Sequence, residues 1–291
     1  MDNWLSEQVG FLPGAVNIGF IRGEWGTYLI DTGIDNSSVN KAVRASGEVT
    51  GAIVTHHHAD HIGGLNKLEK KGISDLYAPA NELDFIRHPS NEPYTMFGGG
   101  IPPKLLKNRH LEAKPCKSVR PCTEQNIVEP VPTPGHTIDH HAYLFDGYFF
   151  TGDAAFTNET IEKYGLLFAV DPQTAADSAN AMRSQKFEQM IPGHGPLQEQ
   201  RSDAFEVLDA TANHYRSTAE RVLSILGESL PIKDYIAVTM DQLAISDIVK
   251  ARGFIQYILY QVPLMGYLSN LLDEQKVQIE MERKGPILRV Q

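Results

Sequence analysis

The stretch GAIVTHHHADHIGG, residues 51–64, holds four of the chain's eleven histidines within six positions. The apolar letters before the histidines are typical of a short buried strand that runs directly into the cluster. Side chains at alternate positions of a strand point in common directions. We therefore expect His56 and His58 to face one metal ion, while Asp60 and His61 reach a second one. Imidazole and carboxylate groups suit zinc, and also iron or manganese.

Three further residues with the same chemistry follow predicted strands or lie in glycine-bracketed turns. His136 stands in TPGHT, Asp153 in FFTGDA and His194 in MIPGHGP. Side chains at such positions project from strand ends, and glycine lets the backbone pack closely. Together with the first cluster they supply five histidines and two aspartates. Seven such groups suffice for two ions with a bridging carboxylate and a hydroxide between them.

The ordered set THHHADHIGG, PGHT, TGD and PGHG resembles the metallo-β-lactamase superfamily, from about residue 10 to residue 198. The resemblance implies an αββα sandwich of two sheets with helices outside, within the α/β (α+β) class. It also implies two divalent metal ions, zinc before iron or manganese. One ion would be held by His56, His58 and His136, the other by Asp60, His61 and His194, with Asp153 bridging both.

The resemblance further implies hydrolysis by a metal-bound hydroxide, with Asp60 orienting it or carrying a proton to the leaving group. Asp153 points away from true β-lactamases, which lack that aspartate. The following GDAAFTNETI lacks the Gly-Cys-Gly-Arg segment usual in glyoxalase II, and Phe156 stands where lactonases often carry a tyrosine. We expect an ester, thioester or lactone substrate. The alternatives are an endoribonuclease or phosphodiesterase of the lactamase-β-like type, and an iron-dependent oxidoreductase similar to persulfide dioxygenases.

From about residue 200 the apolar residues follow helical spacing in place of short strand-like runs. We expect a catalytic domain over residues 1–199 and a helical, winged-helix-like region over 200–291 that ends in a β-hairpin turning near residues 284–286. Within the first domain, residues 37–46 predict a helix capped by Ser37 or Ser38. The Pro- and Gly-rich segment 87–110 predicts a long irregular loop, either a lid over the site or a surface excursion.

The charge and the apolar content of the chain indicate which partners and which location to expect. The formal charge of −10, and seven basic against eight acidic residues from Gly227 onward, argue against a nucleic-acid partner. We expect a small-molecule substrate and a cytoplasmic protein, because we find no signal peptide and no apolar run of about 18 residues. The C-terminal region would pack on the catalytic domain or on a second subunit, so a homodimer is one arrangement it could support.

We do not expect the remaining histidines or the two cysteines to bind metal. We expect His57 to pack or support its neighbours, and either His140 or His141 to hold a ligand by a hydrogen bond or to serve the structure. Cys116 and Cys122 fit neither a zinc knuckle nor a CxxC pair, and we expect two free thiols rather than a loop disulfide. Three histidines have no motif context: His88, His110 and His214.

Overall fold

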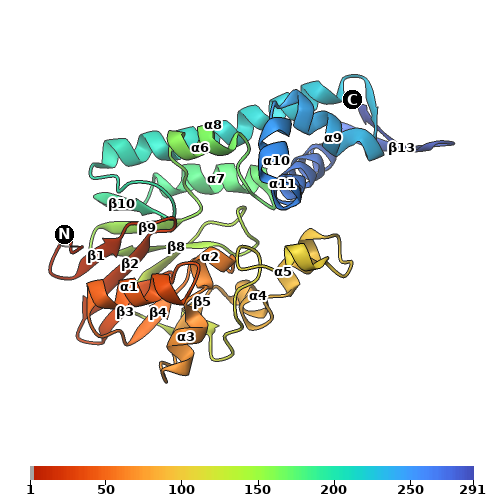
Figure 1. Cartoon of the computed structure of the whole chain (residues 1–291). Coiled ribbons are helices and arrows are strands. Elements are labelled where there is room, and N and C mark those ends of the chain that lie inside the picture. The colour runs from red at the N-terminus through yellow and green to blue at the C-terminus, as the bar shows by residue number, and fades with distance from the viewer. Residues whose placement is uncertain (1–2) are drawn as a thin grey trace.

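Two β-sheets form the centre of the computed structural model, which describes residues 3–291 (Figure 1). The first sheet has the strand order β1 (Val9–Leu12), β2 (Ile18–Gly23), β3 (Gly26–Ile30), β4 (Gly51–Ile53), β5 (Asp75–Ala78) and β6 (Arg120–Pro121). The second has the order β10 (Gln189–Pro192), β9 (Tyr148–Gly152), β8 (His141–Phe145) and β7 (Glu129–Pro132). The pairs β3–β4, β4–β5, β5–β6 and β9–β10 are parallel, and the remaining pairs are antiparallel.

Alternating side chains of the first sheet divide the apolar core into layers. Leu29 and Ala52 pack outward with α1 (Asn36–Ser46) and α3 (Leu65–Lys70). Their strand neighbours, among them Ile53, point inward to a core shared with the second sheet. This period of two is what a sheet buried on both faces requires.

The outer face of the second sheet is covered by two helices, α7 (Pro172–Met182) and the first half of α8 (Arg201–Leu226). Phe149 on β9 meets Met182 of α7 and Leu208 of α8 in this layer. Figure 1 shows the resulting order of helix, sheet, sheet and helix. The expected αββα sandwich is therefore confirmed.

The connecting segments contain short helices. They are α2 (Ala59–Ile62), α4 (Leu83–Arg87), α5 (Asn91–Met96) and α6 (Asn158–Tyr164), with 3₁₀ turns at Ala80–Glu82, Lys104–Leu106 and Cys122–Glu124. The segment 87–110 is thus less irregular than predicted. The predicted cap of α1 was wrong: Asp35 is the N-cap, and its Oδ1 accepts hydrogen bonds from the backbone N–H groups of Ser37 and Ser38 at 2.9 and 3.0 Å.

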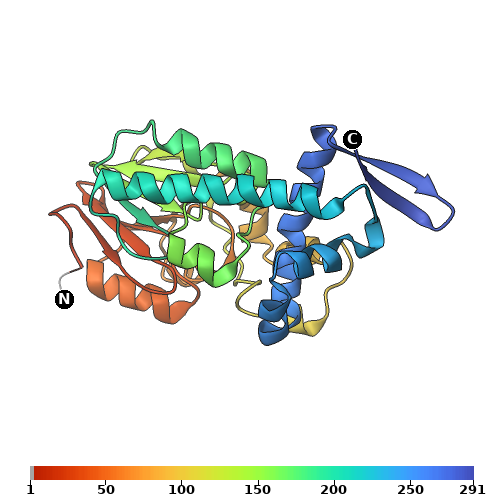
Figure 2. The same cartoon turned by 90° about the horizontal axis from the view of Figure 1, so that it is seen from above.

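The C-terminal region carries the expected winged-helix-like pattern. After α8 come β11 (Ser229–Pro231), α9 (Ile232–Gln242), α10 (Ser246–Arg252), α11 (Phe254–Asp273), β12 (Val277–Glu282) and β13 (Gly285–Val290), with sheet order β11-β13-β12. The predicted hairpin, β12 with β13, projects from the body of the molecule (Figure 2). The second half of α8 packs with these helices through Val222 and Leu226, and a domain boundary at residue 200 stays a prediction.

Among residues 3–291, no helix combines the length and apolar character needed to cross a membrane.

Candidate metal centre

The loop after β4 is positioned by a carboxylate at the end of the neighbouring strand β3. Asp31 adopts the left-handed backbone conformation (φ 60°), which is uncommon for residues other than glycine. Its Oδ1 accepts a hydrogen bond from the backbone N–H of Thr55 at 2.8 Å, and its Oδ2 lies 2.7 Å from His61 Nδ1. The Thr55 hydroxyl lies in turn 2.9 Å from His56 Nδ1. These contacts turn the Nε2 atoms of both imidazoles away from Asp31, and side-chain partners of this kind fix the tautomer of metal-binding histidines.

Three imidazoles meet at the first position. His58 Nδ1 lies 3.0 Å from His56 Nε2 and 2.9 Å from His136 Nε2. The opposite nitrogen of His136, Nδ1, donates to the carbonyl of Phe168 at 3.0 Å. Burial and the neighbouring His58 imidazole lower the pKa of His136 to about 3, and burial also holds the pKa of His56 well below its usual value. The rings are therefore neutral, and neutral imidazole is the form that binds a metal.

A second set of donor atoms lies beside the first. Asp60 and His61 come from α2, and His194 follows β10. His194 Nδ1 donates to the carbonyl of Ala15 at 2.6 Å, which leaves Nε2 at 3.7 Å from Asp60 Oδ2. Each residue of this set offers one ligand atom, and those atoms lie within 4.8 Å of one another.

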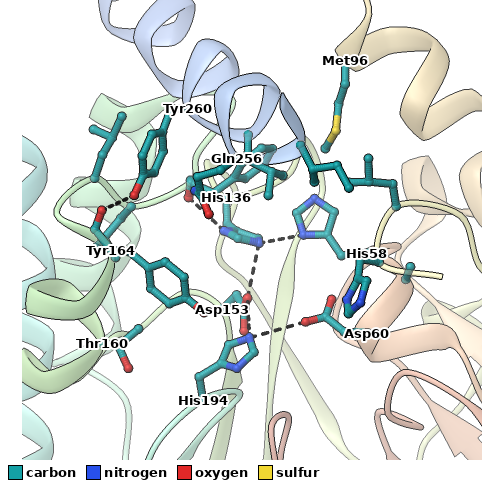
Figure 3. A pocket seen from close by; sticks show the side chains of 18 of the residues that line it. His58, Asp60, Met96, His136, Asp153, Thr160, Tyr164, His194, Gln256 and Tyr260 are labelled. Atoms are coloured by element: carbon teal, nitrogen blue, oxygen red, sulfur yellow. Dashed lines mark hydrogen bonds and ion pairs between the residues drawn. The ribbon is translucent and has the colours of Figure 1, made fainter. Parts of the chain in front are cut away.

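Asp153 faces both sets. Its Oδ2 lies 3.6 Å from His136 Nε2 and 3.3 Å from His194 Nε2 (Figure 3). Its Oδ1 lies 3.2 Å from His61 Nε2. Its backbone N–H donates to His140 Nε2 at 3.1 Å, so His140 holds this residue by a hydrogen bond. Although burial raises the pKa of Asp153, the charges of His194 and His61 bring it well below the usual value.

Two atoms of this arrangement lack partners. Within residues 3–291, the buried His61 Nε2 and Asp153 Oδ1 approach each other without the geometry of a hydrogen bond, and neither has another hydrogen-bond partner. Buried polar groups are rarely left unsatisfied, and such a group calls for an explanation. A cation bound here would satisfy both atoms, so the donor set fits divalent metal ions.

The motif glycines leave room for these ligands. A Cβ added at Gly193 would lie 2.3 Å from Asp153 Oδ1, and one added at Gly135 would lie 2.2 Å from the backbone nitrogen of Ala175. Both distances are too short for any side chain. The glycines of PGHT and PGHG are therefore required by close packing around the site.

His57 turns away from both sets, into a buried pocket between two glutamates. Its Nδ1 contacts Glu82, its Nε2 lies 2.5 Å from Glu92 Oε2, and its ring stacks on Phe85 at 4.2 Å. Burial lowers the pKa of His57, but the two carboxylates outweigh it and raise the pKa to about 10. Both ring nitrogens of His57 are occupied by these carboxylates, so neither nitrogen faces the two donor sets. Although His57, His58 and Glu92 also lie close together, we do not count His57 as a ligand.

The sequence predicts the seven residues that converge here, but it did not predict the carboxylates that hold them in place by hydrogen bonds. Asp31 had a detectable signal, because it ends a strand within LIDTG much as Asp153 does within FFTGD. Glu82 and Glu92 had none, since nothing near them in the sequence marks a site. The prediction of free thiols is confirmed, because Cys116 and Cys122 are both buried and unpaired with each other.

A cavity of about 540 Å³ opens over the site (Figure 3). His58, Asp60, His136, Asp153 and His194 form its floor. The rest of its lining is mainly apolar or aromatic: Met96, Leu111, Phe156, Tyr164, Leu166, Leu167, Phe168, Ile255, Leu259 and Tyr260. A concave, mostly apolar pocket with a few convergent polar groups is the usual form of a small-molecule site.

The comparisons agree with this geometry. The family model described as the metallo-beta-lactamase superfamily matches residues 12–194. A metallo-beta-lactamase family protein from Thermus thermophilus has a similar structure, with a TM-score of 0.73 at 16% identity, covering 98% of this chain and 100% of that one.

Two relatives are similar in sequence. A hydroxyacylglutathione hydrolase of Shewanella denitrificans is 32% identical over 130 residues, which are 45% of this chain and 43% of that enzyme. A probable metallo-hydrolase, YybB, of Bacillus subtilis is 29% identical over 189 residues, 62% of this chain and 80% of that protein. The match thus spans less than half the length of the first relative.

Proposed function

Because the chain belongs to the metallo-beta-lactamase superfamily and is similar to hydrolases of that superfamily, we propose that it is a binuclear metallohydrolase acting on an ester, thioester or lactone. The observation that carries this proposal is the placement of Asp153 between two three-residue donor sets at the floor of one cavity. A shared carboxylate is the arrangement expected of a two-metal hydrolytic site.

The ligands would be two sets and one bridge: His56, His58 and His136; Asp60, His61 and His194; and Asp153. Imidazole and carboxylate donors favour zinc, and they also accept iron or manganese. Two such ions, when bound, lower the pKa of water at the site and polarise a carbonyl oxygen.

The residues around the floor supply positioning and proton transfer. Asp60 lines the cavity, and His194 Nε2 lies 3.7 Å from Asp60 Oδ2 and 3.3 Å from Asp153 Oδ2 (Figure 3). We assign to it the proton that the attacking water loses and the leaving alcohol or thiol gains as the acyl bond breaks. Asp31 and His140 hold His61 and Asp153 in place through the hydrogen bonds described above.

The lining of the cavity favours an acyl substrate over RNA. Outside the donor sets it carries one guanidinium, that of Arg252, among mainly apolar side chains. A nucleic-acid site would require several cations along a strand of phosphates. Phe156 cannot donate a hydrogen bond to a substrate carbonyl, whereas Thr160 and Tyr164 place hydroxyl groups in the cavity wall.

The proposal is tested by metal analysis together with a substrate panel. We expect about two ions per chain, and turnover of p-nitrophenyl esters, thioesters or lactones that falls at least about 100-fold in His58→Ala. The matched control is His88→Ala, which removes an exposed histidine outside the cavity.

Three outcomes would contradict the proposal. They are a single tightly held ion that Asp153→Ala does not release, turnover that persists in His58→Ala, and, when RNA and a persulfide are added to the panel at matched metal loading, cleavage of RNA or oxidation of the persulfide without turnover of any ester, thioester or lactone.

A further inference from the structure

The roof of the site cavity is made by the C-terminal region. The first turns of α11 contribute Ile255, Gln256, Leu259 and Tyr260 to the cavity lining. Figure 3 shows Gln256 and Tyr260 above the donor sets. The spacing of the four residues puts them on one face of the helix. The aliphatic side chains of this face line the cavity together with Leu166 and Leu167, so a ligand in this part of the site loses water on contact with hydrocarbon.

A second cavity, of about 590 Å³, meets the first at the donor sets. The two share Asp60, His110, Thr160, Tyr164 and His194. The second cavity is otherwise lined by different segments, including Leu12–Val16 and the start of α1. A substrate whose scissile bond lies over the shared residues therefore has room on either side, in one cavity or the other.

The second cavity differs from the first in charge: outside the donor sets the first is lined by one cation and one anion, Arg252 and Glu92, and the second by two lysines and one glutamate. Lys41 of α1 and Lys163 of α6 line it, and neither forms an ion pair with another residue of 3–291. Glu159 is the single acid of its lining besides Asp60. Lys163 Nζ lies 5.0 Å from the ring centre of Tyr164, at the boundary between the cavities. In a chain of net charge −10, two unpaired lysines beside the site favour an anionic group.

The donor sets indicate which half of the substrate takes which cavity. His58 and His136 line only the first cavity, whereas Asp60 and His194 line both. Asp60 is the residue to which we assign the proton for the leaving group. The leaving group therefore lies on the side that Asp60 shares with the two lysines, and the acyl group lies on the α11 side.

We propose that the substrate is an ester or thioester with an apolar acyl chain and an anionic leaving group, the chain lying beneath α11 and the anion beside Lys41 and Lys163. This inference rests on the proposed hydrolase function. It makes α11 the element that selects the acyl chain, and α1 with α6 the elements that select the leaving group.

The acyl half is tested with the metal-loaded full chain and two probes, octanoyl- and acetyl-coenzyme A. We expect kcat/KM to be at least about tenfold higher for the octanoyl thioester. Leu259→Trp, which fills the cavity, should lower kcat/KM for the octanoyl thioester at least about tenfold and so abolish this preference, while the melting temperature stays close to that of the unchanged protein. If that variant does not fold, inhibition by octanoate compared with acetate on the unchanged protein reads the same preference. Equal rates and equal inhibition for both chain lengths would overturn the inference.

The leaving-group half is tested with octanoyl-coenzyme A against octanoyl-N-acetylcysteamine, which carries no phosphate. The double variant Lys41→Ala/Lys163→Ala should raise KM for the coenzyme A thioester about tenfold and leave the uncharged thioester unchanged. The matched control is Lys70→Ala/Lys71→Ala, which removes two exposed lysines of the α3 segment. Equal KM values in both double variants would overturn the assignment. Turnover without either preference refutes this inference alone, whereas no turnover of any ester or thioester refutes the proposed function.

Discussion

Glu82 joins the two loops that carry the first donor set, and its replacement by glutamine offers a sharp test of that role. The carboxylate accepts hydrogen bonds from the His57 backbone N–H at 3.1 Å, the Thr137 hydroxyl at 2.8 Å and the Asp139 backbone N–H at 3.0 Å, and it also contacts the His57 ring. Burial raises the pKa of Glu82, but these donors and the charge of His57 lower it to about 2. We therefore expect Glu82 to stabilise the folded chain strongly.

The magnitude follows from the pKa. The pKa of the Glu82 carboxyl is 4.5 in the unfolded chain and about 2 in the folded chain. This difference contributes roughly 3 kcal/mol to the free energy of unfolding at neutral pH. Removing one partner of a buried ion pair costs about 3–5 kcal/mol, and an amide retains some of the hydrogen bonds. Glu82→Gln should therefore lower the free energy of unfolding by about 2–4 kcal/mol, and the melting temperature by about 4–10 °C.

Thermal and urea unfolding at pH 7, after removal of metal, measure this effect. The control is Glu69→Gln: Glu69 accepts two backbone hydrogen bonds at 2.7 Å, but its side chain is half-exposed, so we expect a loss below about 1 kcal/mol. The contribution of Glu82 is present above pH 4.5 and is lost as the pH falls towards 2, so the difference from the unchanged protein should narrow in acid. A melting temperature within 1 °C of the unchanged protein at pH 7 would refute the reasoning.

Two other predictions concern glycine geometry and acid stability. Gly135→Ala should cost roughly 3 kcal/mol or more in urea unfolding and reduce turnover, because φ is +123° and the new Cβ would meet Ala175 beside His136; a loss below about 1 kcal/mol would contradict this. Burial, with a smaller effect of Arg221, lowers the pKa of His214 to about 4. Between pH 6.5 and 4 the unfolded chain therefore binds a proton that the folded chain does not. The free energy of unfolding should fall by up to roughly 3 kcal/mol over this range. His214→Gln should flatten this acid limb in unfolding curves recorded across that range, and an unchanged slope would show that His214 is not its source.

The sequence alone determined the sandwich and the residues that gather at its edge. Four of the site residues lie within six positions of the loop after a strand: His56, His58, Asp60 and His61. Their proximity is local, so the spacing in the sequence predicts it. Strand ends bring the more distant members to the same edge of the sheets, because parallel strands align their carboxyl ends there.

Tertiary structure decided the orientation of the ligands and the surroundings of the site. Asp31, Glu82 and Glu92 lie 24 to 35 residues from their partners in the histidine loop, and the atom that each imidazole presents depends on these contacts. The roof that α11 adds to the site cavity comes from a segment still farther along the chain. Such contacts depend on how finished elements pack, and no local pattern of residue types records them. The sequence therefore determined which atoms could hold metal, and packing decided where those atoms point and what kind of substrate can reach them.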